Sequence, residues 1–188
     1  MALLDDILTF NKGFVESKEY ETLRSNKYPE KKLVIISCMD TRLVELLPKA
    51  MNFRNGDVKI IKVAGAIVSH PFGSIMRSIL VAVYELGAAE VCVVGHHDCG
   101  MSSIQAQNTI QKMKERGISE DKIETLRYSG IDLNRFLRGF SSVQDSVKHS
   151  VETIQNHPLL VSDVPVHGMV IDPKTGELEV IINGYNHQ

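Results

Sequence analysis

Two stretches of this chain decide its fold: LVIISCMDTR at residues 33–42 and VCVVGHHDCG at residues 91–100. Each begins with apolar, mostly β-branched residues that do not alternate with polar ones, a pattern typical of a strand buried on both faces of a parallel sheet. Each then changes abruptly to polar and thiol-bearing residues. We therefore expect two parallel strands whose carboxyl ends present chemically reactive side chains to one edge of the sheet.

The rest of the chain alternates helical and strand patterns. Apolar residues at helical spacing predict helices at residues 2–24, 74–86, 102–116, 119–127 and 141–156. Further strands are predicted at residues 58–63, 164–171 and, after a tight turn, 178–182. Together these elements predict an α/β fold, with a mainly parallel central sheet, helices on both faces and an antiparallel C-terminal edge strand. We expect residues 1–188 to form a single domain.

Composition and charge exclude several classes of protein. The net charge of -2 gives no overall basic field that would indicate a nucleic-acid partner. Asp5 and Asp6 stand where a secretory signal would have basic residues. The most apolar run, residues 79–83, is far shorter than the roughly 20 residues of a membrane span. We expect a cytoplasmic protein with no nucleic-acid or membrane partner.

The three cysteines differ in their surroundings. Cys92 lies inside an apolar strand pattern and is interpreted as a buried, inert residue, whereas Cys38 and Cys99 lie beyond the predicted strands. His96 precedes Cys99 by three residues on a bend, so one ion could contact both side chains. Thiolate and imidazole together select zinc, and three protein ligands leave a fourth position open for catalysis. The competing interpretation is two core thiols and a hydrogen-bonded histidine without a metal.

Asp40 and Arg42 lie two residues apart directly after Cys38. In an extended segment both side chains are on one side, where a guanidinium and a carboxylate can form a bidentate pair. Paired, Asp40 stays ionised and can accept a proton from a metal-bound hydroxide. Unpaired, it could swing in as a fourth ligand and close the site. The alternative is a surface ion pair of little consequence.

The motifs Cys38-x-Asp40-x-Arg42 and Gly95-His96-x-x-Cys99-Gly100 resemble those of the β-class carbonic anhydrases, and the resemblance extends from about residue 30 onward. It implies Zn²⁺ held by Cys38, His96 and Cys99, with Asp40 and Arg42 as the catalytic pair. It also implies reversible hydration of CO₂ to bicarbonate and a proton, through attack by zinc-bound hydroxide.

The same resemblance places Gly65 and Gly100 at the substrate pocket. It further implies a homodimer or higher assembly, in which the N-terminal helix at about residues 2–24 packs on the partner subunit. The N–H groups of the helix that Gly100 opens would favour the thiolate of Cys99.

The chain departs from the family pattern at two positions. Ala66 stands where the family has the asparagine of an A-G-N loop, and His97 stands where a small serine or threonine is usual. His97 is a candidate proton relay, because imidazole titrates near neutral pH, or a residue that only packs. The alternative functions are hydrolysis of COS or CS₂ on the same fold and a non-catalytic zinc-binding homologue.

Overall fold

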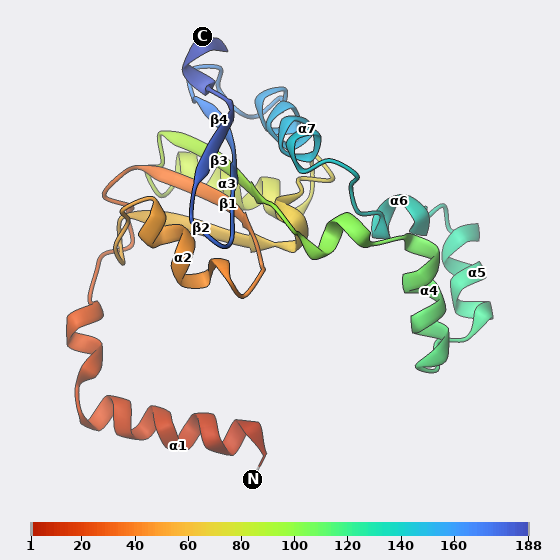
Figure 1. Ribbon diagram of the computed structural model, residues 1–188, viewed down its shortest axis with the longest axis horizontal. Helices are drawn as coiled ribbons and strands as arrows, with labels where there is room; N and C mark the ends of the chain where they lie inside the picture. The colour runs from red at the N-terminus through yellow and green to blue at the C-terminus, as the bar shows by residue number, and fades with distance from the viewer. Residues whose placement is uncertain (1, 188) are drawn as a thin grey trace.

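A five-stranded sheet forms the centre of the computed structural model, which describes residues 2–187 (Figure 1). Its strands are β1 (Leu33–Cys38), β2 (Val58–Val63), β3 (Glu90–His96), β4 (Val166–Ile171) and β5 (Leu178–Ile182). They lie in the order β2-β1-β3-β4-β5, with the first four parallel and β5 antiparallel to β4. The predicted fold class, including the antiparallel edge strand, is confirmed.

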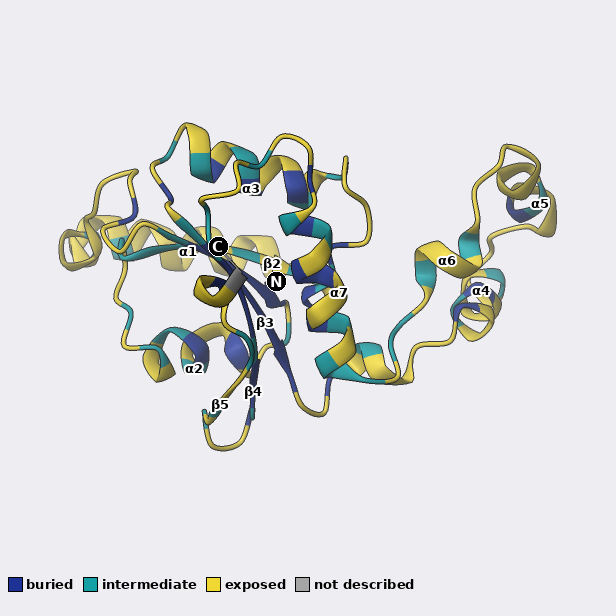
Figure 2. Ribbon diagram, turned by 90° about the horizontal axis from the view of Figure 1, so that it is seen from above, coloured by how far each residue is buried: buried dark blue, intermediate teal, exposed yellow. Residues whose placement is uncertain are grey.

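Both faces of the sheet are covered by helices, which explains why its central strands are apolar throughout. One core contains Val34 and Ile36 of β1 and packs against α3 (Ser74–Tyr84) and α7 (Val143–Gln155). The other contains Ile35 of β1 and Cys92 and Val94 of β3, and packs against α2 (Leu43–Ala50). Successive side chains of a strand point to opposite faces, so both sets are buried (Figure 2).

The remaining helices extend away from the sheet at two sides of the molecule (Figure 1). They are α1 (Leu3–Glu16), α4 (Ala106–Glu115), α5 (Glu120–Tyr128) and α6 (Leu133–Leu137). The prediction of one helix over residues 2–24 was wrong, because Lys18 adopts a left-handed φ of 59° and a separate 3₁₀ helix follows at Glu19–Leu23. No helix in the described part of the chain is long and apolar enough to cross a membrane.

Two glycines allow α7 to approach the sheet closely beside the candidate site. A Cβ atom at Gly95 would lie 2.7 Å from Cγ2 of Val143, and one at Gly168 would lie 2.7 Å from Cγ1 of Val147. Such distances are too short for carbon atoms, so larger residues would push the helix away. The close packing fixes the backbone of β3 directly before His96.

Candidate metal centre

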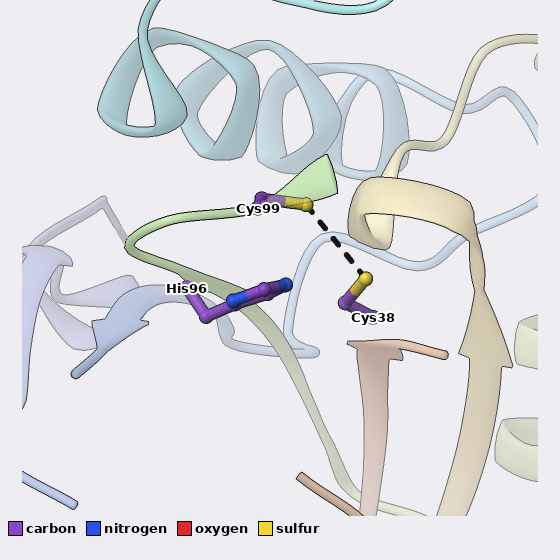
Figure 3. Close-up of side chains that lie close together, drawn as sticks. All are labelled: Cys38, His96 and Cys99. Atoms are coloured by element: carbon purple, nitrogen blue, oxygen red, sulfur yellow. Dashed lines mark hydrogen bonds between the residues drawn. The ribbon is translucent and has the colours of Figure 1, made fainter. Parts of the chain in front are cut away.

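The ends of β1 and β3 bring the predicted metal ligands together. Cys38 is the last residue of β1 and His96 the last residue of β3, its parallel neighbour. Cys99 follows three residues later, directly before a short 3₁₀ helix at Gly100–Ser103. All three side chains are buried, and their ligand atoms lie within 4.8 Å of one another (Figure 3).

The spacing of the two sulfurs suits a tetrahedral zinc ion. Sγ of Cys38 lies 3.8 Å from Sγ of Cys99. Two sulfurs each about 2.3 Å from a tetrahedral zinc would be separated by about 3.8 Å. The cysteines are free thiols, so both sulfurs are available as ligands.

The imidazole of His96 is oriented as a metal ligand. Its Nδ1 lies 2.8 Å from the backbone carbonyl oxygen of His97, to which it donates a hydrogen bond. That bond leaves the lone pair on Nε2, which is buried and has no hydrogen-bond partner among the described residues. A buried acceptor without a partner is costly, and a cation at this position would satisfy it. The donor set therefore fits Zn²⁺.

The two thiols of the cluster differ in acidity. Burial raises the pKa of Cys38, but the imidazole of His96, which in its protonated form donates to the Cys38 sulfur, and the backbone N–H groups of Asp40 and Gly65 outweigh it and lower the pKa to about 7. Burial raises the pKa of Cys99 to about 11, and the backbone N–H of Met101 offsets only part of that cost. Cys38 therefore ionises first, and a divalent cation would draw the proton from Cys99.

The N–H of Met101, in the 3₁₀ helix that follows Cys99, lowers the pKa of this thiol as predicted, but the opposing effect of burial is larger. Cys92 behaves as expected, since burial raises its pKa to about 12. Such a thiol stays protonated and unreactive at neutral pH.

Asp40 and Arg42 form the predicted bidentate ion pair at the edge of the cluster. Nε of Arg42 donates to Oδ1 of Asp40 at 2.9 Å, and Nη2 donates to Oδ2 at 2.8 Å. These hydrogen bonds hold the pKa of Asp40 well below its usual range, so the carboxylate stays ionised. Its Oδ2 lies 3.8 Å from Nε2 of His96, within reach of a molecule bound at the cluster.

Arg42 also contacts Asp98, a residue that the sequence interpretation missed. Nη1 of Arg42 donates to Oδ2 of Asp98 at 2.8 Å, and Nη2 donates to its backbone carbonyl oxygen at 2.8 Å. The signal in the sequence is an acidic residue between His96 and Cys99. The left-handed φ of Asp98, 51°, turns its carbonyl and carboxylate toward Arg42, and no motif predicts that turn.

An apolar cavity of about 350 Å³ opens beside the cluster and contains both glycines predicted at the substrate pocket. Its lining residues are Cys38, Met39, Asp40, Thr41, Ala64, Gly65, Cys99, Gly100, Met101 and Ile104. Gly65 has a φ of 67°, and its N–H donates to Sγ of Cys38 at 3.3 Å. A Cβ at this position would lie 3.0 Å from Met101, so the loop requires glycine.

His97, the candidate relay, lies outside the cluster and is exposed. Its backbone N–H donates to the carbonyl oxygen of Ile171 at 3.1 Å. Backbone hydrogen bonds from Lys174 and Thr175 lower the pKa of the nearby Asp172 carboxyl, and the His97 ring makes a smaller contribution in the same direction. The structure therefore places this imidazole at the surface next to the β4–β5 turn.

Comparison with known proteins identifies relatives over most of the chain. A family model described as carbonic anhydrase matches residues 33–178. The chain is 65% identical over 187 residues to YtiB of Bacillus subtilis, whose name assigns it provisionally to the carbonic anhydrases, and the match covers 100% of both proteins. It is also 25% identical to a carbon disulfide hydrolase of Acidithiobacillus thiooxidans, with 79% of this chain and 76% of that protein covered.

Among solved structures, a β-carbonic anhydrase of Trichomonas vaginalis superimposes with a TM-score of 0.89 at 34% identity. The superposition covers 98% of this chain and 100% of the other. The similarity therefore includes the N-terminal helix and the whole sheet as well as the two motifs.

Proposed function

The chain belongs to the β-class carbonic anhydrase family, and we propose that it catalyses the reversible hydration of CO₂ to bicarbonate and a proton. One observation carries the proposal. The buried Cys38, His96 and Cys99 cluster has an ionised carboxylate at its edge and opens onto an apolar cavity. CO₂ is small and apolar, so it suits the cavity, whereas the cluster suits the polar reactant, water.

Cys38, His96 and Cys99 would hold Zn²⁺, which when bound lowers the pKa of a coordinated water to about 7. Asp40 then accepts a hydrogen bond from the attacking water and orients its lone pair toward the carbon of CO₂. Arg42 keeps the Asp40 carboxylate ionised and fixes its direction. The Gly65 N–H fixes the position of the Cys38 sulfur, and Gly65 and Gly100 line the apolar cavity in which CO₂ would bind. We propose His97, an exposed imidazole directly after the ligand His96, as the residue that passes the product proton to solvent.

Stopped-flow measurement of CO₂ hydration by the zinc-loaded protein tests the proposal. We expect hydration well above the buffer rate at mildly alkaline pH, because the site supplies both a nucleophile and a hydrogen-bond acceptor. CS₂ and COS are assayed in parallel, since one relative is a carbon disulfide hydrolase. Turnover of CS₂ or COS without CO₂ hydration would overturn the proposal in favour of that hydrolase. Full zinc occupancy with no turnover of any of the three would indicate a non-catalytic homologue.

We further propose that residues 1–188 act as one domain and assemble as a homodimer or higher oligomer through α1. No residue of α1 is buried, although one stripe of the helix is strongly apolar. Its exposed apolar side chains are Leu3, Leu4, Ile7, Leu8, Phe10 and Val15. A monomeric protein rarely exposes a continuous apolar surface of this kind, and a second subunit would cover it.

Replacing both Leu4 and Leu8 by glutamate should convert the assembly to monomers, because each change would bury a charge in the proposed interface. Light scattering after size-exclusion chromatography measures the mass. The matched control is Lys12→Gln, which alters a side chain on the same helix that pairs with Glu16 and is exposed. An unchanged mass for the double variant would place the interface elsewhere.

A further inference from the structure

The Arg42 side chain joins the two motifs of the site. Four of its five N–H groups donate hydrogen bonds, two to the Asp40 carboxylate, one to the Asp98 carboxylate and one to the Asp98 carbonyl oxygen. Asp40 follows β1 and Asp98 follows β3. The guanidinium group is therefore held from two sides, and its plane cannot rotate without breaking contacts to both motifs.

The position of that plane determines the direction of the Asp40 carboxylate. Oδ2 of Asp40 accepts from Nη2 of Arg42 at 2.8 Å, yet the same oxygen is only 3.8 Å from Nε2 of His96. Rotation of the Asp40 side chain away from Arg42 would bring it toward the ligand atoms of the cluster. A carboxylate there would occupy the coordination position that the substrate water requires.

We propose that Asp98 is a positioning residue that anchors Arg42, so that Asp40 stays paired with Arg42 and away from the fourth position of a metal at the cluster. The inference rests on the proposed function only in that the cluster holds a metal. The contacts to Asp98 exist when Arg42 faces Asp40, and they therefore favour that arrangement over the one in which Asp40 is released.

The contribution of Asp98 is geometric more than electrostatic. Its side chain is 76% exposed, so water screens the charge that it brings to the ion pair. Its backbone, with a φ of 51°, points the carboxylate and the carbonyl oxygen at adjacent nitrogens of one guanidinium. Since Asn and Gly also tolerate this φ, the side chain can be changed there without straining the loop.

Azide binding to the cobalt-substituted protein tests the inference, because azide is an anion that takes an open metal position and cobalt reports its binding by visible absorption. Asp98→Gly removes the carboxylate and introduces a residue for which the φ of 51° is allowed. We expect the dissociation constant for azide to rise about tenfold or more, as is common when a residue behind a metal site is lost. Asp98→Asn, which retains one acceptor oxygen, should give a smaller rise.

The same substitution in an Asp40→Ala background supplies the discriminating control. With no Asp40 carboxylate to compete for the metal, Asp98→Gly should leave azide affinity unchanged. A similar loss of affinity in both backgrounds would show that Asp98 supports the loop generally and would overturn the inference. Equal azide affinity of the Asp98→Gly variant and the unmodified protein would overturn it as well.

The azide experiment and the CO₂ hydration assay can fail independently, because azide binding requires the metal but no turnover. A protein that fails to hydrate CO₂ yet gives the expected azide results would overturn the proposed function and support the role of Asp98. A protein that hydrates CO₂ but shows no effect of Asp98→Gly on azide affinity would support the proposed function and overturn the role of Asp98.

Discussion

Replacing Cys38 by serine is expected to abolish zinc retention and CO₂ hydration together. The sulfur of Cys38 is the more acidic of the two in the cluster, with a pKa of about 7, and it lies 3.8 Å from the second sulfur. A serine hydroxyl does not ionise at neutral pH and is a poor ligand for zinc in place of a thiolate. Metal content by atomic absorption and stopped-flow hydration should both fall to background.

The chain offers a matched control for this substitution. Cys92 is also a buried thiol on a central strand of the sheet, but it lies outside the ligand cluster. Cys92→Ala should therefore retain full zinc and full activity, even though it removes a buried sulfur. If Cys38→Ser kept stoichiometric zinc and normal turnover, the assignment of this residue as a ligand would be wrong.

The sequence predicts the ligand cluster well because its geometry follows from parallel pairing. A buried strand is recognisable from an unbroken apolar run, and the residues at the ends of neighbouring parallel strands must meet. Cys38 and His96 are the last residues of two such strands, and Cys99 is near His96 along the chain. The pairing of β1 with β3 is the one long-range contact needed to bring the three ligands together.

The features that the sequence does not predict depend on single backbone angles or on solvation. The left-handed φ of Lys18 ends the N-terminal helix, although the apolar pattern of the sequence continues beyond it. The left-handed φ of Asp98 creates the contact with Arg42. Lysine and aspartate both occur commonly in other conformations, so neither identifies the turn. The raised pKa of Cys99 depends on how deeply the thiol is buried, which no local pattern records.

The catalytic contribution of Asp40 can be separated from metal binding by replacing it with alanine. In the structure Asp40 is paired with Arg42 and is not part of the ligand cluster, so the variant should retain zinc. It should lose about 10²- to 10⁴-fold in the hydration rate, the range expected when a positioned proton acceptor is removed. Stopped-flow kinetics and metal content are measured on the same preparation, so that the two effects are compared directly.

Glu45→Ala is the matched control for Asp40→Ala, because Glu45 is an exposed acidic residue on α2 that pairs with Lys49 at 2.6 Å. The two substitutions change the net charge equally, so a general electrostatic effect would appear in both. A selective loss of turnover in Asp40→Ala would assign the orientation of the attacking water to this carboxylate. Loss of zinc from that variant would instead mean that Asp40 is a metal ligand, and normal turnover would mean that the thiolate and imidazole ligands suffice for the reaction.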